Sequence, residues 1–129
     1  MRSVVLHLAA GGFIFVCLVA SLSCGQDQKL VSISVTPASF TFSNAVGGET
    51  VQFTAIGQFV HPPSTKDLTQ QVTWSTPTPD VLTVDSHGLG TVAGVACGTN
   101  IPVTATAKTH AGPIPGSATV DVKLAGASC

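Results

Sequence analysis

The chain has 129 residues, of which 44% are hydrophobic and 9% are charged, and its formal net charge is -1. This length suits one domain, and the apolar content is high enough for a packed core, which argues against disorder. Because only five residues are Lys or Arg, the sequence has no basic stripe to neutralise phosphates, and nucleic-acid binding is disfavoured.

The first 23 residues have the pattern of a secretory signal peptide. Arg2 is followed by a nearly uncharged apolar run from Val4 to Leu22 and then by small residues. Such a segment is removed on export and takes no part in the fold. The run is also long enough to span a bilayer, so an uncleaved membrane anchor is the alternative.

The end of this segment resembles the signal of bacterial lipoproteins. In that family small residues precede a cysteine whose sulfur receives a diacylglycerol, and here Ser-Leu-Ser precedes Cys24. The family has Leu three positions before the cysteine, whereas Leu22 lies one position later. The resemblance implies a lipid on Cys24, a tether over residues 24–29 and attachment to a membrane. Gly25 in place of an aspartate implies the outer membrane, with a periplasmic or secreted location as the alternative.

The cysteine count agrees with this interpretation. Of four cysteines, Cys17 leaves with the signal peptide. If Cys24 carries a lipid, Cys97 and Cys129 are left as the one pair available for a disulfide in an oxidising compartment. A free thiol at each position is the alternative.

Residues 30–129 alternate apolar and polar side chains, with turn residues between short runs, as in a β-sandwich. VSISVT (31–36) places Val31, Ile33 and Val35 on one face. Pro37 ends this run, and Phe40 and Phe42 resume an inward face, so we expect the strand to break there and to continue against a second sheet.

The next strands contribute the largest core side chains. After the turn at residues 47–48, ETVQFTAIGQF (49–59) places Phe53 inward, and QVTWS (71–75) and DVLTVD (80–85) follow. Residues 60–69, with adjacent Pro62 and Pro63, are predicted to be an irregular connection that projects from one end. Trp74 is predicted to fill the core. The expected core residues are Trp74, Val72, Phe53, Leu82, Val84, Val103 and Val120.

The last two runs, NIPVTATAK (100–108) and SATVDVKL (117–124), predict a hairpin. The intervening THAGPIPG is too rich in proline for a two-residue turn. The hairpin brings Cys97 and Cys129 to the same end. However, inward residues are odd-numbered before the turn and even-numbered after it, so the two cysteines would lie on opposite faces of an unbroken ladder. A bulge near Pro102, or a tail that leaves the ladder after Leu124, would remove this conflict.

Four segments, VSISVTPASFTF, GGETVQFTAIGQF, DLTQQVTWSTPTPDVLTVDSHGLGTVAGVACGT and GSATVDV, resemble the bacterial immunoglobulin-like domain of group 2. The resemblance covers about residues 30–124 and implies an all-β, two-sheet Greek-key sandwich of about seven strands. Related modules occur in adhesins and as accessory modules of polysaccharide enzymes. Two departures are His61-Pro62-Pro63 in place of a polar, Gly-containing turn, and Cys97 where a small residue is common.

Residues with catalytic or metal-binding chemistry are scattered. His61, His87 and His110 have neither an i, i+4 partner nor carboxylates at ligand spacing, and Ser86 beside His87 lacks a third group to orient it. We therefore expect no enzyme activity, cofactor or metal. A histidine-dependent hydrolase is the least favoured hypothesis.

The favoured hypothesis is a non-enzymatic, lipid-anchored envelope module used for surface presentation, adhesion or contact with a protein or glycan. A secreted carbohydrate-binding module without a lipid is the alternative, although the low aromatic content, 5%, offers few sugar platforms. End loops are the expected contact surface, with simple solvated connections as the bland alternative. The predicted contact residues are Phe59, His61, Pro62, Pro63, Thr109, His110 and Ile114.

Overall fold

The computed structural model describes residues 28–126 and residue 129. The expected signal peptide and Cys24 lie outside these residues. The described part of the chain is all-β, with ten strand segments and no helix. The strands are β1 (Lys29–Thr36), β2 (Ser39–Ala45), β3 (Thr50–Gln52), β4 (Thr54–Val60), β5 (Ser64–Asp67), β6 (Thr73–Ser75), β7 (Leu82–Val84), β8 (Leu89–Val92), β9 (Gly98–Thr109) and β10 (Gly112–Leu124).

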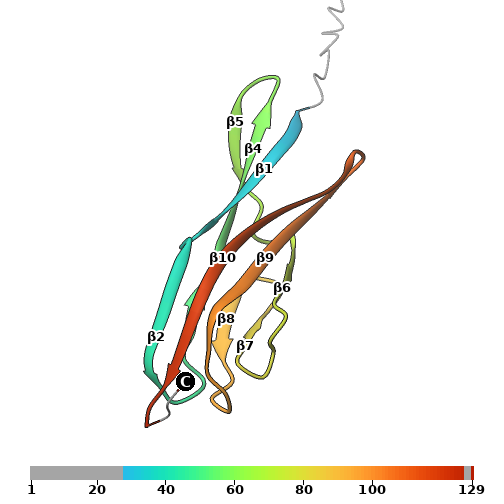
Figure 1. The fold of residues 1–129 in the computed structure, drawn as a ribbon. Coiled ribbons are helices and arrows are strands. Elements are labelled where there is room, and N and C mark those ends of the chain that lie inside the picture. Colours follow the sequence, from blue (N-terminus) through green and yellow to red (C-terminus); the bar gives the residue numbers. More distant parts are fainter. Residues whose placement is uncertain (1–27, 127–128) are drawn as a thin grey trace, which may run out of the picture.

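The strands form the immunoglobulin-like sandwich that the sequence predicts (Figure 1). One layer is a four-stranded sheet with the order β2-β10-β9-β6, and the other layer consists of the sheets β1-β4-β5 and β3-β8-β7. These two smaller sheets are linked because only Phe53 separates β3 from β4. Strands distant in sequence, such as β2 and β10, are neighbours, as Greek-key connections require. There are more segments than the seven expected because single runs are divided between sheets.

The chain changes layers at Pro37, as predicted. Before it, β1 pairs antiparallel with β4, and after it, β2 pairs parallel with β10. Proline has no N–H to donate to a ladder, so it suits this crossing point. The first predicted strand therefore contributes β1 to one layer and β2 to the other.

Two apolar residues of this region do not face inward as predicted. Val31 is 47% exposed because a register shift between Leu30 and Ser32 inserts one extra residue, which buries Leu30 instead. Phe40 is 37% exposed and packs edge-on against the buried Phe42, with ring centroids 4.8 Å apart.

The prediction that residues 60–69 are irregular was wrong. Ser64–Asp67 forms β5, which pairs antiparallel with β4, so the two prolines occupy only the turn between them. Outside the ladder, their missing N–H groups break no strand pairing. The resulting hairpin projects from one end of the sandwich, as expected (Figure 1).

The connection between the last two strands was also predicted incorrectly. Thr109 pairs with Gly112, so the turn contains only His110 and Ala111, and the proline-containing segment belongs to β10. Within the described chain, β10 pairs with β2 only from Thr119 onward. The prolines at 113 and 115 therefore lie where the second edge of β10 has no ladder to interrupt.

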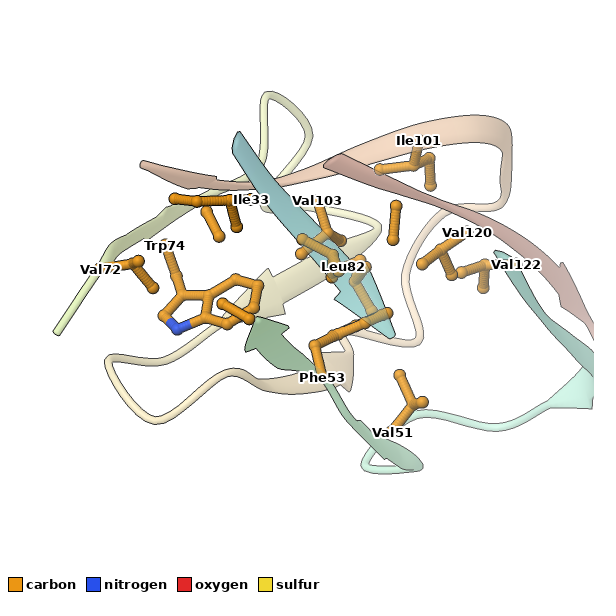
Figure 2. Packing of buried hydrophobic residues seen from close by; sticks show 14 of the residues in the cluster. Ile33, Val51, Phe53, Val72, Trp74, Leu82, Ile101, Val103, Val120 and Val122 are labelled. Atoms are coloured by element: carbon orange, nitrogen blue, oxygen red, sulfur yellow. The ribbon is translucent and has the colours of Figure 1, made fainter. Parts of the chain in front are cut away.

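The core lies between the layers (Figure 2). Phe53, Leu82, Val103 and Val120 are completely buried, and Val72 and Trp74 are 8% exposed. The Trp74 indole donates a hydrogen bond from Nε1 to the Thr69 carbonyl oxygen at 2.9 Å, which satisfies its polar atom inside the fold. Val84 differs from the prediction: it is half-buried and packs against the edge of the core.

The disulfide between Cys97 and Cys129 is present, with the two Cα atoms 5.8 Å apart. A bulge in β9 explains why the two cysteines do not lie on opposite faces of the sheet. Val120 pairs with Ile101, but Val122 pairs with Gly98, so β9 has one extra residue here. Within the bulge Asn100 has a positive φ of 54°, and its backbone N–H donates to the Asp121 carboxylate at 2.7 Å. The ladder also ends at Leu124.

Candidate functional site

A groove of about 730 Å³ lies at the end of the sandwich where β1 begins. Its walls come from the start of β1, the end of β4, the segment after β5 and the turn between β9 and β10. Apolar atoms contribute more of its surface than polar atoms do. The apolar side chains that line it include Leu30, Phe59, Leu68 and Ile114.

The groove unites part of the predicted contact surface. Phe59, Thr109, His110 and Ile114 all line it, although they come from distant parts of the chain. His61, Pro62 and Pro63 form the neighbouring β4–β5 turn, where they are exposed but do not line the groove.

Hydrogen bonds of the Thr109 side chain hold the turn between β9 and β10, which forms one wall of the groove. The Thr109 hydroxyl donates to the Gly112 carbonyl oxygen at 2.7 Å and accepts the Ala111 N–H at 3.2 Å. This pattern closes a two-residue turn and leaves the His110 side chain exposed. The turn is therefore a fixed wall of the groove.

Lysines surround the groove. Lys29 and Lys108 line it, and the Lys66 ammonium lies over the Phe59 ring, 4.9 Å from its centroid, where a cation is attracted to the ring face. All three side chains are exposed. In the described part of the chain, the one ion pair joins His87 to Asp85, so these lysines have no carboxylate partner there.

A second hollow, of about 500 Å³, lies elsewhere on the surface and is mainly polar. Gln52, Thr54, Asp67, Thr69 and His87 are among its lining residues. The Thr69 hydroxyl accepts the Ala55 N–H at 3.0 Å. Hydrogen bonds from Thr69 lower the pKa of Asp67, because they favour the charged carboxylate.

Ser86, His87 and Asp85 lie together, but not as a catalytic triad. The Ser86 hydroxyl is 3.3 Å from His87 Nδ1, and Asp85 Oδ2 is 3.9 Å from the same nitrogen. A triad instead uses one imidazole nitrogen for the nucleophile and the other for the carboxylate. Asp85 has a structural role, since its Oδ1 accepts the N–H groups of His87 and Leu89 at 2.8 and 2.9 Å. These two hydrogen bonds lower the pKa of Asp85, and the bond from Leu89 has the larger effect.

The described residues hold neither a cluster of metal ligands nor a membrane-spanning helix. Within residues 28–126 and 129, no three His, Cys, Asp or Glu side chains gather as a metal site would need. The same residues contain no helix that is long and apolar enough to cross a membrane.

Comparison with protein families identifies the domain. The family model for the bacterial Ig-like domain (group 2) matches residues 29–117. The chain belongs to this family. A search of curated proteins returned no match. Domains of this family are generally non-catalytic modules of the surface or adhesion type.

The opposite end of this Ig-like domain carries two exposed valines. Val46 and Val95 are 75% and 78% exposed. They lie on neighbouring turns, because a Cβ added to Gly47 would meet the Gly94 Cα at 3.0 Å. Both lie at the end of the domain that the Cys97–Cys129 disulfide cross-links.

Sequence reasoning missed several residues of both ends. Lys29, Leu30, Leu68 and Lys108 line the groove but were not predicted as contact residues. Lys108 fell in a predicted strand, whereas Lys29 was placed in the tether and Leu68 in the irregular connection, and β-alternation alone does not show which strand ends meet. The exposure of Val46 carried no signal, because a lone valine beside two glycines is equally consistent with a buried strand end.

Proposed function

We propose that this chain is a non-enzymatic, lipid-anchored envelope protein that presents one end of an Ig-like domain to a surface partner. The single observation that carries the proposal is that the two ends of the described chain lie at opposite ends of the sandwich (Figure 1). An anchor before β1 would hold the end with the groove near the membrane. The turns with Val46 and Val95 would then point away from it.

The proposed anchor is a diacylglycerol on Cys24, five residues before the start of β1. The residues before Cys24 resemble a lipoprotein signal, and an exported protein with one disulfide fits an oxidising compartment. The outer membrane is the proposed location. A single domain anchored in this way works as a spacer and a contact module.

The far end offers an apolar contact to a partner protein. Val46 and Val95 present two branched side chains on touching turns. The Gly48 N–H donates to the Val92 carbonyl oxygen at 2.8 Å, and the Val92 N–H donates to the Glu49 carbonyl oxygen at 2.9 Å. These bonds hold one of the turns in place, which lowers the cost of ordering on binding.

Intact-mass spectrometry of the protein extracted from its membranes tests the anchor. The expected species begins at Cys24 and carries a diacylglycerol, and a Cys24→Ser variant should lack that added mass. Detection of the wild-type chain without any acyl mass would refute the lipid anchor.

A secreted carbohydrate-binding module is the second candidate, and the polar hollow is the observation that favours it. Amide, hydroxyl and carboxylate groups from Gln52, Thr69 and Asp67 converge there, and such groups hydrogen-bond sugar hydroxyls. A glycan array probed with the exported protein separates the candidates. Binding that is lost in Gln52→Ala would support this function, whereas a silent array would reject it.

A further inference from the structure

We propose that the groove end of the domain is a seat for anionic phospholipid headgroups, with Lys29, Lys66 and Lys108 contacting the phosphates. This inference rests on the proposed anchor, since it describes how the anchored domain is oriented. It assigns a membrane contact to the predicted contact residues that line the groove, in place of a protein or glycan contact.

The distance to the anchor makes direct contact with a bilayer feasible. Lys29 is five residues after Cys24, and five extended residues span at most about 18 Å. Lys29 pairs with Val60 at the tip of the β4 ladder, so the reach of the tether applies to the whole groove end. A lipid on Cys24 therefore keeps this end, and no other, within a short distance of the headgroups.

Most lysines of the domain lie at the end that would face the membrane in this orientation. Three of the four lysines that follow Cys24 surround the groove, whereas Lys123 lies near the end of β10, at the other end of the sandwich. The groove-lining residues include no Asp or Glu, and Asp67, which follows Lys66 on β5, lines the separate polar hollow. Each lysine near an anionic membrane surface contributes a factor of about five to binding. Together the three would favour the seated orientation by about a hundredfold.

The apolar atoms of the groove suit the layer just below the phosphates. Phe59 and Ile114 are half-buried, so part of each side chain remains available to the boundary of the acyl chains. Lys66 lies over the Phe59 ring, and a lysine can keep its ammonium at the phosphates while its methylene groups cover apolar surface. This combination of basic and aromatic groups is typical of surfaces that lie in a membrane interface.

Amine labelling in vesicles tests the seat. The protein purified from membranes is reconstituted into phosphatidylcholine vesicles, with or without one quarter phosphatidylglycerol, and treated with a membrane-impermeant acylating reagent. Lys123 in the same molecules is the internal reference. We expect the labelling rates of Lys29, Lys66 and Lys108 to fall at least fivefold relative to Lys123 in the anionic vesicles, and to recover in 0.5 M salt. Equal relative rates in both vesicle types would overturn the proposal.

A double variant shows whether the lysines act together. Lys29→Gln with Lys66→Gln should weaken the seated state about 25-fold, so the protection of the remaining Lys108 should fall well below its value in the wild-type protein. Lys123→Gln is the matched control and should leave the protection unchanged. Since all these side chains are exposed, Trp74 fluorescence should be unaltered in every variant. Protection of Lys108 that is as strong in the double variant as in the wild type would contradict a shared electrostatic contact.

The lipid anchor and the headgroup contact can be refuted independently of each other. Intact mass of the same sample reports the lipid on Cys24, whereas the lysine rates report the headgroup contact. An acylated protein with unprotected lysines would keep the anchor and refute the seat, leaving the groove for a protein partner. If the protein lacks a lipid, salt-sensitive co-sedimentation with anionic vesicles, reduced in the lysine variants, would support the seat without the anchor.

Discussion

The two ends of the sandwich are built differently. At the end where β1 begins, the β4–β5 and β9–β10 hairpins surround an open groove edged by lysines. At the other end, the turns at residues 46–48 and 93–95 touch through glycines, and the Cys97–Cys129 disulfide fixes the C-terminus. One end is open and basic, and the other is closed and carries exposed valines.

The two ends of this small domain therefore offer two different contact surfaces. The groove end suits a broad, charged surface, for which hairpin tips and flexible lysines are sufficient. The disulfide end suits a fixed contact, since cross-linking and tight turns limit its motion. Substitutions in the shared core, at the disulfide and in the turns separate what both ends depend on from what belongs to one end alone.

The largest effect is expected in the core that joins both ends. Trp74→Ala should lower the free energy of unfolding by about 3 to 5 kcal/mol, because it removes a buried ring that packs beside Phe53. Urea unfolding followed by far-UV circular dichroism measures this loss. Trp74→Phe keeps a ring and should lose less. A loss below about 1 kcal/mol in Trp74→Ala would mean that the indole is not a core element.

Removal of the disulfide should cause the second-largest loss in the free energy of unfolding. Cys97→Ser with Cys129→Ser should cost about 3 to 4 kcal/mol, because the bond closes a loop with a sequence separation of 32 residues. Reduction of the wild-type protein is the control and should give a similar shift of the urea midpoint. An unchanged midpoint would show that the bulge and the tail alone hold this end.

The third-largest loss of stability is expected at Gly116, where β10 of one layer approaches β1 of the other. A Cβ added to Gly116 would collide with the carbonyl oxygen of Ile33, and this backbone atom cannot move as a side chain can. Gly116→Ala should therefore cost about 1 to 3 kcal/mol in urea unfolding. The neighbouring Ser117 is exposed, so Ser117→Ala should stay within about 0.5 kcal/mol of wild type. Equal stability of the two variants would contradict the close approach of β1 to β10.

The smallest effect concerns pH. The pKa of Asp85 is lowered in the folded protein by the N–H groups of Leu89 and His87. A carboxylate with a lowered folded pKa stabilises the fold above its unfolded pKa, near 4, and this contribution is lost as the pH falls through the folded value. Thermal unfolding between pH 6 and pH 2 should therefore show a smaller acid-induced loss in Asp85→Asn than in wild type. Identical pH profiles would show that these bonds do not favour the carboxylate.

Much of the fold could be predicted from the sequence because inward residues alternate along most strands. The β9–β10 pair illustrates this: Val103 and Val120 are completely buried, as their alternation predicts. The same rule failed at Val31, because one bulge residue reverses every side chain beyond it. The two-residue turn at His110 was missed for another reason: prolines disfavour a strand only where their N–H would be needed.

The candidate site was predictable only in part. Phe59, Thr109, His110 and Ile114 were singled out as end-loop residues, and the structure places them around one groove. The lysines were not linked to this groove, because Lys29, Lys66 and Lys108 are far apart in sequence and only strand pairing brings their strands to the same end of the sandwich. Their gathering at one end depends on topology, which single-strand patterns do not contain.

Amide hydrogen exchange of the membrane-purified protein, compared in detergent and on anionic vesicles, tests the proposed orientation of the domain. We predict slower exchange on the vesicles at the β4–β5 turn and at the β9–β10 turn, with no change at residues 46–48 and 93–95. Protection of the turns that carry Val46 and Val95, with none at the groove end, would show that the domain has the opposite orientation and would contradict the account.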